Sequence, residues 1–215
     1  AYEIRPRDWS SDVCSSDLDW ALRRAVADHG RWSLLGLEVP RIAVNVSALQ
    51  LRRGDFAARV GAILKEERLA GAPPPEIDIE ITETSEIHDL AAADKCIQTL
   101  RQMGFRVGID DFGSGAASLQ YLHGLNVDFV KVDGSLIRRL GTSGRDDALL
   151  KGVLASCNEM GVDTVAEWID SPERFKRCAE IGFRYGQGRH FGEPLNNLPR
   201  DINYAPVRGR RMGTG

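Results

Sequence analysis

The chain has 215 residues, which is enough for one domain with a substantial hydrophobic core and too short for two domains of ordinary size. Its hydrophobic share of 42%, charged share of 27% and formal net charge of −3 are those of a soluble globular domain. They argue against non-specific binding to a DNA or RNA polymer or to an anionic membrane. No apolar run approaches the roughly 18 residues that span a bilayer, and no signal-peptide pattern opens the chain.

The cysteines are four widely spaced residues, Cys14, Cys96, Cys157 and Cys178, and no two of them form a CxxC pair. A chain with a core of this size does not need a disulfide framework, and zinc sites require closer spacing. We therefore predict free thiols in a reducing compartment and a cytoplasmic location.

The beginning of the chain has no clear structural pattern. The stretch RDWSSDVCSSDL repeats the unit SSD and shows almost no apolar periodicity, so it predicts neither strand nor helix. We interpret residues 1–18 as a linker or foreign sequence, residues 19–197 as one domain, and residues 198–215 as a polar, basic tail.

From residue 18 onward, strands and helices alternate. Short β-branched runs predict strands at 42–47, 77–82, 105–110, 127–133, 162–167 and 183–188. Apolar residues at helical spacing predict helices near 18–29, 56–64, 97–103 and 146–160, and a further helix that begins at Ser171-Pro172-Glu173. In the last three of these helices, we expect the apolar faces to include Met103, Leu149 and Phe175, respectively.

This alternation predicts βαβ units and a parallel sheet, and so an α/β fold. A TIM-like (β/α) barrel needs about eight strands and about 250 residues, so six strands imply a barrel that is incomplete at its N-terminus. An open doubly wound sheet is the alternative architecture. Because a missing strand leaves an open edge and an unfilled core layer, we expect the isolated chain to be marginally folded or to aggregate.

Every predicted strand ends in a polar residue that could bind a metal ion, a phosphate or a water molecule. In chain order these residues are Asn45, Glu80, Asp110 with Asp111, Lys131, Glu167 and Gln187. Ligands of parallel α/β folds gather at the carboxyl ends of the strands. Clustered carboxylates repel one another, and hard divalent cations such as Mg²⁺ or Mn²⁺ relieve that repulsion. Two adjacent aspartates could share two cations, an arrangement suited to cleavage of a phosphate ester.

Taken singly, each of these residues has an ordinary structural interpretation. Asn45 and the pair Asp110-Asp111 are typical of turns, Gln187 of a loop between glycines, and Lys131 of a structural ion pair. Glu80 is harder to explain in this way, because an unpaired glutamate in a buried strand is rare. The prediction of a site rests on their shared position at one end of successive strands.

Six segments resemble the EAL domain family in order and spacing. They are NVS (45–47), EITE (80–83), DDFGSGAASL (110–119), VDFVKVDGSLIRRL (127–140), AEWID (166–170) and GQGRHFGEP (186–194). The resemblance covers about residues 18–197. It implies a TIM-like barrel that linearises cyclic di-GMP to pGpG with two Mg²⁺ or Mn²⁺ ions.

The resemblance also implies a role for each matching residue. Asn45 and Glu80 would hold the first cation, Asp110 would bridge both cations, and Asp111 would hold the second. Lys131 would orient the attacking water or a phosphate oxygen, Glu167 would act as a ligand or general base, and Gln187 would support that water. Glu83 would anchor the DFGSG loop, which in many members shapes metal binding and the dimer interface. No organic cofactor is implied.

The sequence departs from the family pattern at several points. The Glu-Ala-Leu motif is absent, although its glutamate is expected about 40 residues before Asn45, where Glu3 is the one acid without another assignment. Trp168 replaces a glycine beside Glu167, Asp170 replaces a glutamate, and Ala116 stands where a tyrosine is common. A tryptophan there could crowd the second cation.

These departures leave three hypotheses open. The first is an active phosphodiesterase, and the second is a catalytically inactive EAL module that binds cyclic di-GMP or a protein partner. The third is an unrelated divalent-metal barrel enzyme that acts on a carboxylate or phosphate ester. The resemblance further implies cyclic di-GMP as the small-molecule partner, a homodimer, and an upstream sensory or GGDEF (diguanylate cyclase) domain.

Overall fold

The computed structural model describes residues 2–4, 15–37, 39, 41–51, 54–82, 87, 89–113 and 118–193. The chain divides into two compact units. Unit one comprises residues 1–109 and 117–127, and unit two comprises residues 110–116 and 128–215. Each unit is built from parallel strands and the helices that connect them.

Unit one contains the strands β1 (Tyr2–Ile4), β2 (Ile42–Ser47) and β3 (Ile77–Thr82) and the first four residues of β4 (Arg106–Phe112). Neighbouring strands are also neighbours in sequence order, and β1, β2 and β3 run parallel. Most residues of β2 and β3 are buried on both faces of the sheet. This burial explains their β-branched composition, which is typical of strands in parallel sheets.

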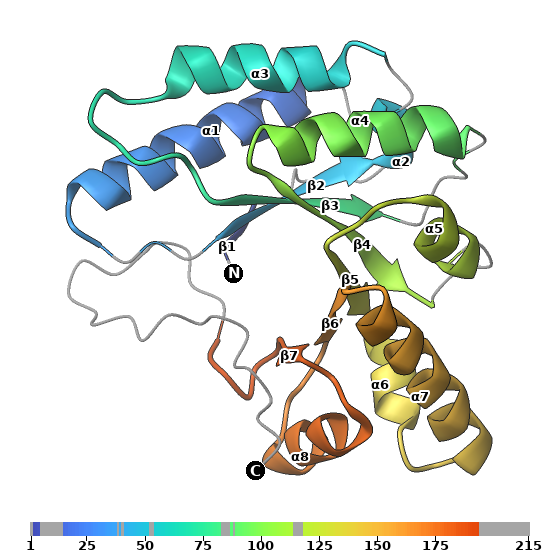
Figure 1. Ribbon diagram of the computed structural model, residues 1–215. Coiled ribbons are helices and arrows are strands. Elements are labelled where there is room, and N and C mark those ends of the chain that lie inside the picture. Colours follow the sequence, from blue (N-terminus) through green and yellow to red (C-terminus); the bar gives the residue numbers. More distant parts are fainter. Residues whose placement is uncertain are drawn as a thin grey trace. The chain divides into compact units, whose positions relative to one another are not determined.

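Five helices belong to unit one: α1 (Ser15–Leu34), α2 (Ala48–Leu51), α3 (Phe56–Glu67), α4 (Leu90–Gln102) and α5 (Ser118–Gly124). Figure 1 shows α1, α3 and α4 grouped on one side of β2 and β3. Their buried side chains fall at helical spacing, as Val60 and Ile63 in α3 and Ile97 and Leu100 in α4 illustrate. The core of unit one lies between these helices and the sheet.

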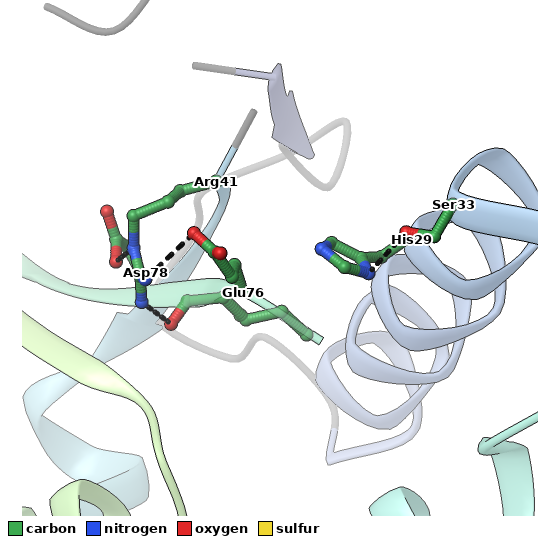
Figure 2. Close-up of polar contacts among 6 residues, drawn as sticks. His29, Ser33, Arg41, Glu76 and Asp78 are labelled. Atoms are coloured by element: carbon green, nitrogen blue, oxygen red, sulfur yellow. Dashed lines mark hydrogen bonds and ion pairs between the residues drawn. The ribbon is translucent and has the colours of Figure 1, made fainter. Parts of the chain in front are cut away.

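The beginnings of β2 and β3 are held together by Arg41 (Figure 2). Its guanidinium lies 2.5 Å from Asp78 and 3.3 Å from Glu76, and it also donates to the Ile77 carbonyl at 3.1 Å. Also shown there, the His29 ring of α1 lies 3.4 Å from the Ser33 hydroxyl, and burial lowers the pKa of this histidine. The contacts of Arg41 fix the amino ends of β2 and β3, opposite the ends where Asn45 and Glu80 lie.

Unit two contains the end of β4, then β5 (Phe129–Val132), β6 (Asp163–Ala166) and β7 (Tyr185–Gly186), with β5, β6 and β7 parallel. Its helices are α6 (Gly134–Arg139), α7 (Gly144–Glu159) and α8 (Pro172–Ile181). Leu150, Leu154 and Cys157 form the buried face of α7, which packs on β6.

Local sequence signals set the bounds of α8. The Ser171 side chain accepts a hydrogen bond from the Arg174 amide at 3.2 Å, and Pro172 occupies the first helical turn. Gly182 ends the helix with φ 105°, a conformation that favours glycine. The sequence had predicted this helix start from Ser171-Pro172-Glu173, and the structure confirms it.

The structure confirms all six predicted strands: β2 and β3 have the predicted bounds, and the ends of the other four are shifted by one or two residues. It also adds elements that the sequence analysis missed: β1, α2, α5 and α6. β1 and the first turn of α1 fall within residues 1–18, where the sequence predicted neither strand nor helix. The apolar signal of both segments is weak. In α1, the packing of the helix as a whole outweighs the weak signal of its first turn.

Two predictions of apolar helix faces were wrong. Leu149 was expected in the buried face of α7, yet it is 64% exposed, because the buried face follows Leu150 and Leu154 instead. Met103 was expected in the face of α4, but it is the residue that caps the helix and is 37% exposed. Leu149 is one position off the buried stripe, and a short periodic pattern does not resolve that difference. Met103 continues the spacing of Leu100 but lies past the end of the helix.

Cys96, Cys157 and Cys178 are free thiols, as predicted, whereas Cys14 lies outside the described residues. Burial raises the pKa of Cys157 to about 11 and that of Cys178 to about 12, so both remain protonated. Among the described helices, none has the length and apolar character that crossing a membrane requires.

Candidate metal and phosphate site

Asn45 and Glu80 lie side by side near the carboxyl ends of β2 and β3 in unit one. The parallel register pairs their Cα atoms directly, so both side chains project from the same face of the sheet. Asn45 is 5% exposed and Glu80 is 4% exposed. The alternate residues Val44, Val46, Ile79 and Ile81 face the other way and are buried apolar side chains. The strand period thus presents two oxygen-bearing groups side by side on one face, while the opposite face is apolar at this point.

The second group of predicted residues surrounds a buried lysine in unit two. Lys131, in β5, places its Nζ atom 2.9 Å from Oδ1 of Asp110 and 2.9 Å from Oε1 of Glu167. Asp110 belongs to β4, and Glu167 directly follows β6, so three strands converge on this point. All three residues are buried.

Asp111 completes the cluster, and its backbone has an unusual conformation. Carboxylate oxygens of Asp110, Asp111 and Glu167 all lie within 4.8 Å of one another. Asp111 has φ 54°, in the left-handed region that aspartate tolerates better than most residues. A normal strand would turn successive side chains to opposite faces, and this local twist lets two consecutive aspartates serve one site.

The turn after Asp111 depends on a glycine. Gly113 has φ 92°, and a Cβ atom at this position would lie 2.3 Å from a methyl carbon of Leu136 in α6. The Phe112 carbonyl accepts a hydrogen bond from the Asp133 amide at 3.1 Å, which ties this turn to the start of α6. The segment Asp111-Phe112-Gly113 is therefore the place where the end of β4 comes close to α6.

The surroundings of Glu167 change the pKa of its carboxyl group. Burial raises the pKa of Glu167 to about 7, with Asp110 and Asp111 contributing in the same direction and Lys131 opposing it. One lysine cannot balance three carboxylates in a buried site, since their formal charges would sum to −2 if all were ionised. A divalent cation would supply the missing positive charge, and all-oxygen ligands suit a hard ion such as Mg²⁺ or Mn²⁺.

Glu167 and Gln187 are adjacent because β7 pairs with β6. The Gln187 amide donates to the Ala166 carbonyl at 2.8 Å, and the Ile169 amide donates to the Gln187 carbonyl at 3.0 Å. Gln187 is half-buried. The residue after β7 therefore stands beside the residue after β6.

The residues that replace the family pattern next to Glu167 lie at the surface. Trp168 is 62% exposed and has φ 55°. Its indole rests on Gly134 at the start of α6, and the Arg138 guanidinium lies 4.8 Å from its ring centroid. Asp170 forms an ion pair with Arg174 in the first turn of α8.

The structure thus brings the predicted residues together as two groups, Asn45 with Glu80 in unit one and Asp110, Asp111, Lys131, Glu167 and Gln187 in unit two. The sequence analysis missed Gly134 and Arg138 as neighbours of Trp168. Only the parallel pairing of β5 with β6 would have placed the segments that follow those strands together. Glu83 and Ala116 lie outside the described residues, and the predicted loop anchor therefore stays a prediction.

Comparison with known proteins identifies one family. The family model described as EAL domain matches residues 15–194. The cyclic di-GMP phosphodiesterase PdeB of Shewanella oneidensis is 36% identical over 153 residues, which cover 71% of this chain and 18% of that protein. The cyclic di-GMP phosphodiesterase NbdA of Pseudomonas aeruginosa is 33% identical over 177 residues, which cover 82% of this chain and 22% of that protein. The chain spans about a fifth of the length of these relatives.

Solved structures agree with the sequence matches. The EAL domain of Mycobacterium smegmatis DcpA aligns with a TM-score of 0.72 and 31% identity, covering 82% of this chain and 78% of that chain. The PaMucR phosphodiesterase, solved as a complex with c-di-GMP, aligns with a TM-score of 0.71 and 28% identity, covering 82% of this chain and 70% of that chain.

Proposed function

This chain belongs to the EAL domain family, and we propose that it hydrolyses cyclic di-GMP to linear pGpG with two divalent cations, Mg²⁺ or Mn²⁺. The observation that carries the proposal is the buried cluster in which Lys131 contacts Asp110 and Glu167 while Asp111 lies within reach. Its combination of carboxylates and one lysine matches the needs of phosphate ester cleavage. The proposed substrate is inferred from relatives that are named cyclic di-GMP phosphodiesterases.

The proposed ligands divide between the two groups of residues. In unit one, Asn45 and Glu80 would hold one cation, and in unit two Asp110, Asp111 and Glu167 would hold the other. Bound cations would supply Lewis acidity to the phosphoryl and leaving oxygens and would lower the pKa of the attacking water. The parallel pairing of Asn45 with Glu80 and the convergence of three carboxylates support this division.

The chain's own residues would orient the reactants and move a proton. Water adds to one phosphorus, the bond from that phosphorus to the 3′ oxygen breaks, and the 3′ oxygen takes up a proton. Glu167 would accept a proton from the attacking water as the general base. Lys131 would orient a phosphate oxygen or the attacking water, and Gln187 would position that water beside Glu167.

The experiment that tests the proposal is chromatographic assay of pGpG formed from cyclic di-GMP in Mn²⁺ or Mg²⁺. We expect Asp110→Asn to lower the rate by about 100-fold or more, since loss of a ligand should cost at least as much as loss of a supporting residue. Asp163→Asn is the matched control, because Asp163 starts β6 at the other end of the strand and pairs with Arg184 at 2.6 Å. Equal rates for wild type and Asp110→Asn would contradict the proposal.

A second candidate function is a catalytically inactive EAL module that binds cyclic di-GMP or a protein partner. The observation that favours it is Trp168, a bulky residue at positive φ directly after Glu167. Tight binding of cyclic di-GMP by the folded wild type without formation of pGpG would favour this function over the first. The proposal also includes a cytoplasmic location, a homodimer and an upstream sensory or GGDEF domain, all drawn from resemblance to the family.

A further inference from the structure

Trp168 presents a large exposed aromatic surface one residue away from Glu167. Consecutive Cα atoms are about 3.8 Å apart, so the indole begins at the edge of the acidic cluster. With 62% of its surface exposed, it contributes little to the hydrophobic core. An exposed tryptophan beside a site that binds phosphates is well suited to contact the rest of a nucleotide.

The backbone holds Trp168 in a conformation that glycine would adopt more easily. A φ of 55° is rare for a bulky residue and costs on the order of 1 kcal/mol. Hydrogen bonds on both sides impose it: the Glu167 amide donates to the Val132 carbonyl at 3.3 Å, and the Ile169 amide donates to the Gln187 carbonyl at 3.0 Å. The indole therefore projects from a fixed segment rather than from a free loop.

The indole of Trp168 also packs against a defined surface of α6. A Cβ atom on Gly134 would lie between 2.4 and 2.8 Å from three carbons of Trp168, so the indole rests directly on the glycine backbone. Arg138, one turn further along α6, places its guanidinium 4.8 Å from the ring centroid, within the range of a cation–π contact. The two contacts set the orientation of the ring.

We propose that Trp168, seated on Gly134 and Arg138, is a stacking platform for one guanine base of cyclic di-GMP. The inference rests on the proposed function, because it takes the phosphates to bind at the acidic cluster. A nucleotide carries its base one sugar away from its phosphate, and Trp168 directly follows Glu167 in the chain. Bases stack on exposed aromatic side chains, and arginine reinforces such contacts.

Three variants separate stacking from simple packing. Trp168→Gly removes the platform and relaxes the backbone, so we expect a protein at least as stable as wild type whose Kd for cyclic di-GMP is raised roughly 10-fold or more. Trp168→Phe keeps an aromatic face, and we expect it to retain most of the affinity. Gly134→Ala keeps the indole but displaces it, and we expect it to weaken binding as well.

The measurement is an equilibrium titration with cyclic di-GMP in which binding is monitored by tryptophan fluorescence. EDTA is present to prevent metal-dependent turnover. Stacking should quench one of the chain's four tryptophans in the wild type and not in Trp168→Gly. In parallel, KM for cyclic di-GMP in Mn²⁺ should rise in Trp168→Gly by a larger factor than KM for bis(p-nitrophenyl) phosphate, a smaller diester without a purine.

The outcomes are distinct from those of the function itself. Quenching and lost affinity in a wild type that forms no pGpG would support the platform and reject the phosphodiesterase. Formation of pGpG with equal Kd and KM for wild type and Trp168→Gly would reject the platform alone. Faster turnover of both diesters by Trp168→Gly would also overturn it, since the indole would then obstruct the site.

Discussion

Lys131 is the residue on which the charge balance of the site depends. Its buried ammonium lies 2.9 Å from Asp110 and 2.9 Å from Glu167, so its removal leaves two buried carboxylates without their cation. Breaking such a contact by removing one partner typically costs about 3–5 kcal/mol. We therefore expect Lys131→Met to lower the free energy of unfolding by several kcal/mol in EDTA, and Mn²⁺ to restore part of the loss.

Thermal denaturation with and without Mn²⁺ measures this effect. Lys176→Met is the matched control, because Lys176 is 79% exposed in its side chain and pairs with Glu180 at 4.0 Å on the surface of α8. We expect the control to change the free energy of unfolding by less than about 0.5 kcal/mol. A Lys131→Met protein as stable as the control would show that the carboxylates do not depend on the lysine.

Glu167 should give the metal-free protein a specific pH dependence. Folding raises the pKa of this carboxyl from 4.5 to about 7, chiefly by burial, so the folded state binds the proton more tightly than the unfolded state. Its stabilising contribution is therefore complete below about pH 4.5 and is lost as the pH rises to about 7. We expect the free energy of unfolding of the wild type, relative to Glu167→Gln, to fall by roughly 3 kcal/mol across that window.

Urea denaturation in EDTA at pH 5 and pH 7.5 measures the difference. Glu167→Gln keeps the shape of the side chain without its titration, so it serves as the reference. Because a cation requires the ionised carboxylate, its affinity for the wild type should change in the opposite direction and increase with pH. Parallel stability curves for the two proteins would show that the environment of Glu167 does not favour its protonated form.

Residue identity alone pointed to residues that the structure gathers in clusters, but not to their local conformation. Each of Glu80, Asp110, Lys131 and Glu167 could be recognised because a polar residue ended an apolar strand. The positive φ of Asp111 and Trp168 could not be predicted in this way, since both are non-glycine residues in a conformation that sequence patterns assign to glycine. The surrounding hydrogen bonds impose that conformation, and they depend on the fold.

At the scale of the element, the segment that joins β6 to α8 is held by a close contact with the turn after β7. A Cβ atom on Gly188 would lie 2.2 Å from the Ile169 carbonyl oxygen, and Gly188 has φ 152°. We expect Gly188→Ala to destabilise the protein by more than about 2 kcal/mol, because backbone must move to make room. It should also lower turnover, since Glu167 and Gln187 lie on the two segments that separate.

The control for this prediction is the same chemical change at an open position. Gly152 lies on the exposed face of α7, with nothing near a Cβ atom built there, so Gly152→Ala should stabilise the protein by about 0.5–1 kcal/mol. Calorimetric melting temperatures of the two variants test the pair. Similar shifts for both would mean that the contact between Gly188 and Ile169 is not required.

Elements were predictable where a long apolar pattern defined them. The strands β2 and β3 and the helices α4, α7 and α8 follow from apolar periodicity and capping residues. The short elements α2, α5 and α6 do not, because fewer than eight residues give too few turns for a recognisable stripe. β1 was missed for the same reason: it has three residues, and pairing with β2 defines it.

At the scale of the whole molecule, the α/β class was predicted correctly from the alternation of strands and helices. The likeness to solved EAL domains confirms the class and the TIM-like barrel type. Which residues meet could not be predicted from spacing, because strand register decides it. Asn45 and Glu80 are 35 positions apart in the sequence and become neighbours only through the pairing of β2 with β3.

The proposed division of ligands predicts that a variant lacking one ligand binds fewer metal ions than the wild type. We expect two Mn²⁺ ions to bind per wild-type chain and one to bind tightly to either Glu80→Gln or Asp111→Asn, since each variant should lose one proposed site. Glu76→Gln, an exposed residue that pairs with Arg41 before β3, should keep two. Isothermal titration calorimetry with Mn²⁺ gives these numbers. A single ion in the wild type, or two in both site variants, would contradict the division.

The most direct test of the central claim is hydrolysis of cyclic di-GMP in ¹⁸O-labelled water with Mn²⁺, with the product analysed by mass spectrometry. If water attacks phosphorus at the acidic cluster, the wild type should release pGpG that carries one ¹⁸O on its 5′ phosphate, and Asp110→Asn should release almost none. Folded wild type that binds both Mn²⁺ and cyclic di-GMP yet forms no labelled pGpG would contradict the claim and identify a nucleotide-binding module instead.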